Sequence, residues 1–291
     1  MSEFKRYPPE FPPPWASAWG DDPHGLWAEF TLREEIQRMR WIEPSKFLMG
    51  SPDDEPERLH NEGPQHEVTI SEGFWLADTA CTQGLWQAVL DQNPSHFEGE
   101  TSFPVEQVSW DDVQGFLAAL ASRFPMATPC LPTEAEWEYA CRAGTATPFS
   151  FGNQITPAQV NYDGNYSYNG GKQGEYRTRT LSVKSLPANG WGLYEMHGNV
   201  WEWCADGLRK YNDHLHCDPC GPDGPDLPRA LRGGSWDYGA GHARAAYRYA
   251  REQGGADDDF GFRLSLRSIR PSQSGAADEA RMGRVAERPP A

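Results

Sequence analysis

Signals that start an α-helix are confined to the first half of this 291-residue chain. Three stretches place a hydroxyl side chain, which can accept a free backbone N–H, before apolar residues at helical spacing; they begin at Thr82, Ser109 and Thr133. From Pro148 onward there is no helix signal of any length. Only two or three helices are therefore expected, and the rest of the chain must fold as strands and irregular backbone.

The remaining sequence favours short strands and many turns. Residues 37–52 predict a strand, a turn and a second strand, and residues 66–79 predict another strand pair around Ser71–Gly73. The chain contains 12 Trp, 13 Phe and 11 Tyr, whose rings bury a large area without needing long regular elements. We predict one α+β, loop-rich domain over residues 37–267, preceded by an extended N-terminal segment (1–36) and followed by a disordered tail (268–291) that is poor in bulky apolar residues.

The formal net charge of −16 excludes some classes of partner. Nucleic-acid binding needs a basic face to neutralise phosphates, and an anionic membrane surface would repel this chain. No stretch approaches a membrane span, and the N-terminus lacks the apolar core of a signal peptide. We therefore expect a cytoplasmic protein whose six cysteines are reduced thiols.

Two short clusters raise the question of a bound metal. Cys217 and Cys220 form a C-x-x-C pair with His214 and His216 nearby, which is half of a common zinc pattern, but no second such pair exists. The acidic run Asp257–Asp259 can bind a cation, although such runs are more often solvated turns.

Six motifs in order carry a resemblance to a known family: "FLMGS", "PVEQVSWDDVQGFL", "LPTEAEWEYACRAGT", "NGWGLYEMHGNVWEWCAD", "LRGGSWDY" and "FGFRL". Over about residues 37–267 the chain resembles the formylglycine-generating-enzyme, or sulfatase-modifying-factor, family. The resemblance implies a variant of the C-type lectin fold, with few helices, short antiparallel strands and long structured loops. Fold alone does not settle function, because one scaffold can carry unrelated activities.

Oxidase members of that family bind copper through a cysteine pair that follows the "GGSW" motif. Counted without gaps, these cysteines would stand near Tyr238 and Ala243, but the stretch from Leu231 to Leu264 contains no cysteine. A soft Cu(I) ion needs thiolates, so no catalytic residue is assigned here. The alternative is a formylglycine-generating-type, metal-dependent oxidase with other ligands, or an inactive paralogue of it.

A second enzyme class shares this fold, the non-haem iron sulfoxide synthases of thiol-histidine biosynthesis. These carry an N-terminal helical domain whose histidines hold iron, whereas only His24 precedes residue 60 here, so we set this class aside. A regulatory partner domain without its own ligand pocket is a third alternative.

The chain is most similar to the variable proteins of diversity-generating retroelements. In these, a reverse transcriptase rewrites a segment from about "RGGSW" to "GFR" by mutating template adenines, and the lectin-like scaffold displays the product as a binding surface. The corresponding segment here is 232–263, and mutated Asn codons can yield every residue that we expect to face a ligand. These residues are Asp237, Tyr238, Gly239, Gly241, His242, Tyr247, Tyr249, Ala250, Asp257, Asp258, Asp259 and Phe260. The competing interpretation is an ordinary lectin-like paralogue with the same loop.

Other residues of this segment are interpreted as its scaffold. Gly233 and Gly234 permit tight turns, and Trp236 should be buried with its indole N–H bonded to the backbone. Arg244 and Arg248 should tie down loop carbonyls or a carboxylate. The Tyr, Gly, His and Asp residues between them suit recognition, which gains affinity when the backbone beneath is rigid.

The resemblance also implies a candidate calcium site. Glu195, Glu202 and the backbone of Gly198 and Val200 match positions that hold calcium in some relatives, and hard oxygen ligands suit Ca²⁺. Asn is usual where Glu195 stands, and Glu202 can instead form a salt bridge. His197 is interpreted as a hydrogen-bonded core residue and not as a base.

The leading hypothesis is a non-enzymatic protein that binds an unidentified protein or glycan through residues 237–260, with calcium as a possible cofactor. Substitutions among Asp237, Tyr238, His242, Tyr247 and Tyr249 should then leave the melting temperature nearly unchanged.

Overall fold

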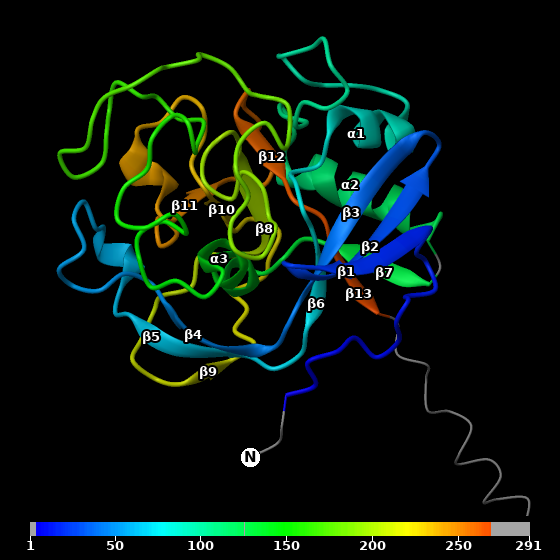
Figure 1. The fold of residues 1–291 in the computed structure, drawn as a ribbon, viewed down its shortest axis with the longest axis horizontal. Helices are drawn as coiled ribbons and strands as arrows, with labels where there is room; N and C mark the ends of the chain where they lie inside the picture. The colour runs from blue at the N-terminus through cyan, green and yellow to red at the C-terminus, as the bar shows by residue number, and fades with distance from the viewer. Residues whose placement is uncertain (1–3, 125, 269–291) are drawn as a thin grey trace, which may run out of the picture.

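The computed structural model describes residues 4–124 and 126–268, so the expected tail lies outside the described residues apart from its first position. The described part contains three α-helices, two 3-10 turns and strands that form three sheets (Figure 1). No described helix has the length and apolarity needed to cross a bilayer.

The largest sheet has six antiparallel strands in the order β1-β2-β3-β6-β13-β7. Their bounds are Ala18–Asp22 (β1), Gly25–Leu32 (β2), Glu35–Ile42 (β3), Phe74–Ala77 (β6), Ser265–Ser268 (β13) and Ala127–Cys130 (β7). Strands β1 and β2 lie within residues 1–36, where we expected only an extended segment. Ala28 and Phe30 are buried and alternate with more exposed neighbours along β2, because successive side chains of a strand face opposite sides. The N-terminal residues therefore contribute to the main sheet.

Two smaller sheets contain the other strands, in the orders β11-β10-β8-β12 and β4-β5-β9. Their bounds are Tyr249–Arg251 (β11), Arg229–Arg232 (β10), Trp201–Gly207 (β8), Phe260–Phe262 (β12), Ser45–Met49 (β4), His66–Ile70 (β5) and His216–Cys217 (β9). The pairings β8–β12 and β5–β9 are parallel, and the others are antiparallel. The strands predicted at residues 37–52 and 66–79 do form. However, β3 and β6 join the six-stranded sheet, whereas β4 and β5 join the three-stranded sheet.

The three predicted helices are confirmed as α1 (Gln83–Leu90), α2 (Trp110–Ala121) and α3 (Glu134–Arg142). Each begins at its expected cap: the hydroxyl oxygens of Thr82, Ser109 and Thr133 accept the backbone N–H three residues later. Helix α3 is capped by Ala143, one residue before the expected Gly144, and both residues have φ values in the left-handed region. The 3-10 turns are η1 (His60–Glu62) and η2 (Ala240–Ala243).

The four-stranded sheet fixes both ends of the segment 233–259. Strands β10 and β12, which precede and follow this segment, flank the same strand β8. Trp201 and Trp203 of β8 are fully buried in the core. Figure 1 shows α3 beside this sheet. The irregular chain between α3 and β8, drawn in green, runs around the outer side of the same sheet. The segment therefore starts and ends at fixed positions beside one strand.

Candidate ligand-binding surface

The segment 233–259 starts with two glycines whose backbone conformations favour glycine. Gly233 and Gly234 have φ values of +98° and +73°, in the left-handed region. A Cβ on Gly234 would also lie 3.0 Å from backbone atoms of Ala243. The chain can therefore turn sharply after β10 and pack closely against η2.

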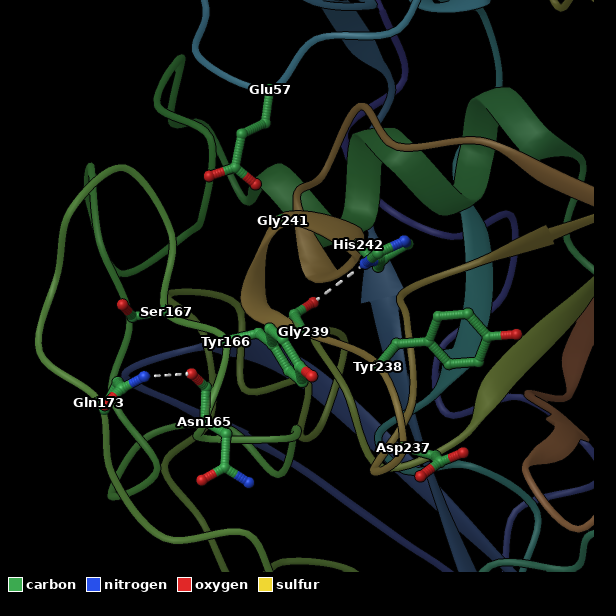
Figure 2. Close-up of a pocket in the computed structure, with 10 residues that line it drawn as sticks. All are labelled: Glu57, Asn165, Tyr166, Ser167, Gln173, Asp237, Tyr238, Gly239, Gly241 and His242. Atoms are coloured by element: carbon green, nitrogen blue, oxygen red, sulfur yellow. Dashed lines mark hydrogen bonds between the residues drawn. The ribbon is translucent and has the colours of Figure 1, made fainter.

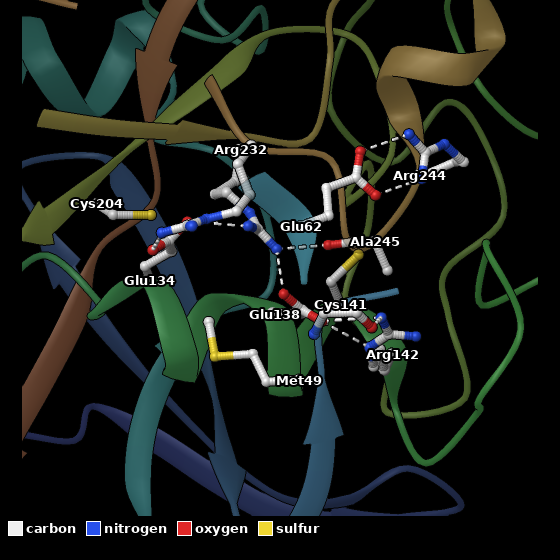
Figure 3. Close-up of polar contacts among 12 residues, drawn as sticks. Met49, Glu62, Glu134, Glu138, Cys141, Arg142, Cys204, Arg232, Arg244 and Ala245 are labelled. Carbon is white, nitrogen blue, oxygen red and sulfur yellow. Dashed lines mark hydrogen bonds and ion pairs between the residues drawn. The ribbon is translucent and has the colours of Figure 1, made fainter. Parts of the chain in front are cut away.

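Arg232, the last residue of β10, is completely buried and bound by two carboxylates of α3 (Figure 3). Its guanidinium donates to Glu134 Oε1 at 3.0 Å, to Glu138 Oε2 at 2.5 Å and to the backbone oxygen of Ala245 at 2.6 Å. Breaking such a pair would leave an uncompensated buried charge. The start of the segment is thus tied to α3 and to its own middle.

Arg244 binds the loop formed by residues 55–62. Its Nη1 donates to Glu55 Oε1 at 2.6 Å and to Glu62 Oε2 at 2.7 Å, and its Nη2 donates to Glu62 Oε1 at 2.7 Å. The same guanidinium also donates to the backbone oxygens of Glu57 and Gly241. Two carboxylates and two carbonyls therefore hold the region around η2 in one position.

Arg248 makes a bidentate contact with α3. Its Nε and Nη2 donate to the two oxygens of Glu134 at 2.7 and 2.6 Å, and Nη1 donates to the backbone oxygen of Asn61 at 2.8 Å. Burial alone raises the pKa of Glu134, but the charges of Arg248 and Arg232 outweigh it, so the pKa is lowered and the carboxyl is ionised. Arg244 and Arg248 are placed as internal anchors of the segment.

Trp236 and Asp259 connect the two ends of the segment. The Trp236 ring is 8% exposed, and its Nε1 donates to the backbone oxygen of Asp258 at 3.4 Å. The Ser235 hydroxyl donates to Asp259 Oδ2 at 2.6 Å. Burial raises the pKa of Asp259 to about 7, and the nearby Asp257 adds to this shift.

The residues expected to face a ligand divide into two groups. Asp259 and Phe260 are buried, so the structure places their side chains beneath the surface, and Gly241 is buried against the Glu57 carboxylate. The others are exposed or half-buried; they are Asp237, Tyr238, Gly239, His242, Tyr247, Tyr249, Ala250, Asp257 and Asp258. Most of the predicted residues are therefore accessible in part.

Three of these residues form what we call the tyrosine platform: Tyr238, Tyr247 and Tyr249. Their ring centroids lie 5.4, 5.8 and 5.2 Å from that of the buried Trp201. The His242 ring packs on Tyr238 and Tyr247 at 5.1 and 4.8 Å. The platform rests on the core through Trp201, and it contributes to packing as well as to the surface.

An open depression of about 660 Å³ lies beside the platform (Figure 2). Its lining combines residues 237–242 with a second loop and with one residue of the 55–62 loop; the full set is Glu57, Asn165, Tyr166, Ser167, Gln173, Asp237, Tyr238, Gly239, Gly241 and His242. Backbone N–H groups of Asp163 and Ala240 donate to the oxygens of Tyr238 and Tyr166, which joins the two walls. Depressions of this size with a few polar groups are typical of binding sites.

Sequence reasoning missed the half of this depression that lies outside residues 232–263. Glu57, Asn165, Tyr166, Ser167 and Gln173 come from two loops earlier in the chain. The only available signal was the composition of the second loop, "NYDGNYSYNGGKQGEY", which is rich in Tyr, Asn and Gly like the segment that it faces.

The expected calcium ligands are only partly free to bind an ion. Both oxygens of Glu202 accept hydrogen bonds from Arg263, and one also accepts the Trp137 indole N–H at 2.7 Å, so this carboxylate is already neutralised. Glu195 is buried, and its Oε1 has no hydrogen-bond partner among the described residues. Burial raises the pKa of Glu195 to about 7. Gly198 and Val200 are buried between these residues in the chain.

Among the described residues, one group of three or more acidic, His or Cys side chains has its ligand atoms within 4.8 Å of one another, namely Asp257, Asp258 and Asp259. The pair Cys217 and Cys220 is not gathered with the nearby histidines in this way. The thiols of Cys141 and Cys204 are fully buried, and burial raises the pKa of both well above the usual value.

His197 lies in the core, as its sequence context suggested. Its Nδ1 is 2.6 Å from the backbone oxygen of Ala243, and its Nε2 accepts the backbone N–H of Ser150 at 3.0 Å. Burial lowers the pKa of His197 to about 4, so the imidazole is neutral at neutral pH. With both ring nitrogens engaged, His197 positions η2 and the loop at Ser150.

Comparison with known proteins places this geometry in a family. A family model described as the sulfatase-modifying factor enzyme 1-like domain matches residues 27–268. The formylglycine-generating enzyme of Streptomyces coelicolor is 36% identical over 182 residues, which cover 59% of this chain and 55% of that enzyme. The chain spans about half or less of the length of the first curated relatives that it matches.

Two solved structures share the fold over nearly their whole length. Treponema denticola variable protein 1 superposes with a TM-score of 0.72 and 26% identity, covering 83% of this chain and 99% of that one. PvdO from Pseudomonas aeruginosa gives a TM-score of 0.72 and 26% identity, covering 86% and 100%. These similarities confirm the expected α+β, loop-rich fold of the formylglycine-generating-enzyme type. The chain belongs to the sulfatase-modifying factor enzyme 1-like family.

Proposed function

We propose that this chain is a non-enzymatic binding protein, of the kind encoded by diversity-generating retroelements, that presents the exposed part of residues 237–258 to a protein or glycan ligand. The observation that carries the proposal is that buried and exposed side chains of the segment have different roles. Gly233, Gly234, Arg244 and Arg248 are buried, and both arginines bind carboxylates outside the segment, whereas Asp237, Tyr238 and His242 line an open depression.

A surface of this kind can change its exposed residues without losing its shape. Arg244 and Arg248 hold the backbone through contacts with Glu55, Glu62 and Glu134, none of which belongs to the segment. A backbone fixed before binding loses less conformational entropy when a ligand binds. The likeness to Treponema denticola variable protein 1 supports the same function.

Family membership favours a second candidate, a formylglycine-generating-type oxidase. The segment 231–264 has no cysteine, and the buried thiols of Cys141 and Cys204 resist the ionisation that a Cu(I) ligand needs. Metal analysis and oxygen consumption with a thiol substrate separate the candidates. Stoichiometric copper or iron together with oxygen uptake would replace the binding proposal by the oxidase.

The DNA around the gene tests the proposal directly. We expect a reverse transcriptase gene and a near-copy of the Arg232–Arg263 coding segment that differs from it only at adenines. The differences should fall in codons of exposed positions such as Asp237 and His242 and should spare Arg244 and Arg248. Finding neither element, or finding changes concentrated at the buried arginines, would reject diversification and leave an ordinary lectin-like paralogue.

A further inference from the structure

The depression has an uneven distribution of charge. Its ten lining residues include two carboxylates, Glu57 and Asp237, and no lysine or arginine. Figure 2 shows these carboxylates at opposite ends of the lining, with Tyr166 and Gly239 between them. His242 adds no positive charge, because burial lowers the pKa of its imidazole.

Further acids surround this lining. Burial, the hydrogen bond that Tyr176 donates to Asp237, and the charges of Asp237, Asp163 and Asp258 all raise the pKa of Tyr176. These three carboxylates therefore lie around the Tyr176 hydroxyl. Arg244 is paired with Glu55 and Glu62, and the exposed cations Lys172, next to Gln173 in the chain, and Arg251, at the Tyr249 ring, do not line the depression. Both charged side chains of the lining are therefore acidic, which favours a cationic ligand.

Internal contacts position the Glu57 carboxylate over the depression. The residue is exposed and has a left-handed backbone, with φ of +58°. Arg244 Nη2 donates to its backbone oxygen at 2.9 Å, and its Oε1 accepts the N–H of Asn169 at 3.0 Å. A Cβ added to Gly241 would lie 2.1 Å from its Oε2, so the absence of a side chain at Gly241 makes room for the carboxylate.

Aromatic faces complete the lining. Tyr166 is 68% exposed, and Tyr238, the half-buried member of the tyrosine platform, also lines the depression. Aromatic faces and carboxylates together attract ammonium and guanidinium groups, the latter through both cation–π contact and hydrogen bonds. Glu57 and Asp237 already accept hydrogen bonds from the Asn169 N–H and the Tyr176 hydroxyl, and a neutral glycan could add further hydrogen bonds but would bring no opposite charge.

We infer that the ligand of this depression is a partner protein that inserts a lysine or arginine side chain between Glu57 and Asp237, against Tyr166 and Tyr238. This inference rests on the proposed binding function and specifies its ligand class. The depression holds more than one such side chain, so a short basic stretch fits better than an isolated residue.

The test is a titration of the full chain followed through its backbone amide NMR signals. The probes are the Nα-acetyl amides of lysine and arginine, the neutral Nα-acetyl-norleucine amide, and a methyl glucoside. We expect the two cationic probes to shift the amides of Gly239, Gly241 and His242 saturably, and the other two to leave them unchanged. Equal shifts with norleucine amide, shifts with the glucoside alone, or no shift with any probe would overturn the inference.

Matched variants separate a site from general attraction to an acidic protein. Glu57→Gln combined with Asp237→Asn should weaken binding of the arginine probe about tenfold, since two charged contacts are lost. Glu34→Gln combined with Asp213→Asn removes the same charge from exposed positions elsewhere and should change binding less than about twofold. Equal losses in both double variants would mean that only net charge matters.

These outcomes also distinguish the inference from the proposed function. Binding of the glucoside or of norleucine amide at the same amides would keep a binding protein and reject a cationic ligand. No binding of any probe, together with stoichiometric copper or iron and oxygen uptake on a thiol, would reject both.

Discussion

Within residues 232–263, the cationic side chains are buried except Arg251, and the acidic side chains are exposed or half-buried except Asp259. The buried cations, each paired with at least one glutamate, are Arg232, Arg244, Arg248 and Arg263. The acids Asp237 and Asp257 are exposed. The segment thus holds itself in place through inward arginines while its outer surface stays acidic. This difference between buried arginines and exposed acids indicates that some side chains of one loop stabilise the fold while others are free for recognition. Substitutions in each group test that separation.

The largest effect is expected for Arg244→Met. The variant removes one guanidinium and leaves Glu55 and Glu62 buried without their partner, so the free energy of unfolding should fall by about 4 kcal/mol. Denaturant unfolding of the purified protein measures this loss. Arg251→Met, at an exposed position of the same segment, is the matched control and should cost less than about 1 kcal/mol. Similar losses in both variants would abolish the distinction between anchors and surface.

Trp236→Ala should lower the free energy of unfolding by about 3 kcal/mol, because it removes a buried ring that packs on Phe97 and Tyr176. The same unfolding measurement applies. Tyr166→Ala, which removes an exposed ring from the depression, should change stability by less than about 1 kcal/mol. A tryptophan variant as stable as the tyrosine variant would show that Trp236 belongs to the surface and not to the frame.

The acidic run Asp257–Asp259 is tested by comparing how stability changes with pH in the variants Asp259→Asn and Asp257→Asn. The pKa of Asp259 is raised in the folded protein, so between pH 5 and 8 the folded state gives up a proton that the unfolded state has already lost, and stability falls. Asn cannot ionise, so the advantage of Asp259→Asn over the native protein should grow by about 2 kcal/mol from pH 5 to pH 8. The exposed Asp257→Asn should show less than about 0.5 kcal/mol of pH-dependent change.

Unfolding curves at both pH values measure these differences, and contributions from other groups such as His197 cancel when each variant is compared with the native protein. A flat difference for Asp259→Asn would mean that the carboxyl is ionised in the fold throughout this range. The contacts of Asp259, such as the hydrogen bond from the Ser235 hydroxyl, would then outweigh the effect of burial on its pKa.

Local signals in the sequence predicted local structure well. The caps at Thr82, Ser109 and Thr133 identify all three helices of the described chain, because capping depends on residues three positions apart. Which strands pair is a long-range matter. The parallel pairing of β8 with β12 and the separation of β3 from β4 depend on core packing that no short window of sequence contains.

Half of the residues that line the depression were expected from the sequence; the other half are brought there by long-range packing. Gly233, Gly234, Arg244 and Arg248 could be assigned to the frame from residue chemistry alone. Phe260 and its exposed neighbours could not be separated, because irregular backbone has no period that reveals which side chains face inward. Glu57 and the 165–173 loop reach the depression only through the tertiary fold.

The smallest effect on stability is expected for substitutions of the outward-facing residues, which the proposal allows to vary most. A variant with Asp237→Asn, His242→Asn and Tyr→Phe at positions 238, 247 and 249 alters five outward groups but keeps the rings that pack on Trp201. Its melting temperature should differ from that of the native protein by less than about 3 °C. Thermal unfolding followed by circular dichroism measures this shift. A larger drop would show that the outward groups also hold the fold, and a segment of that kind could not be diversified without losing its scaffold.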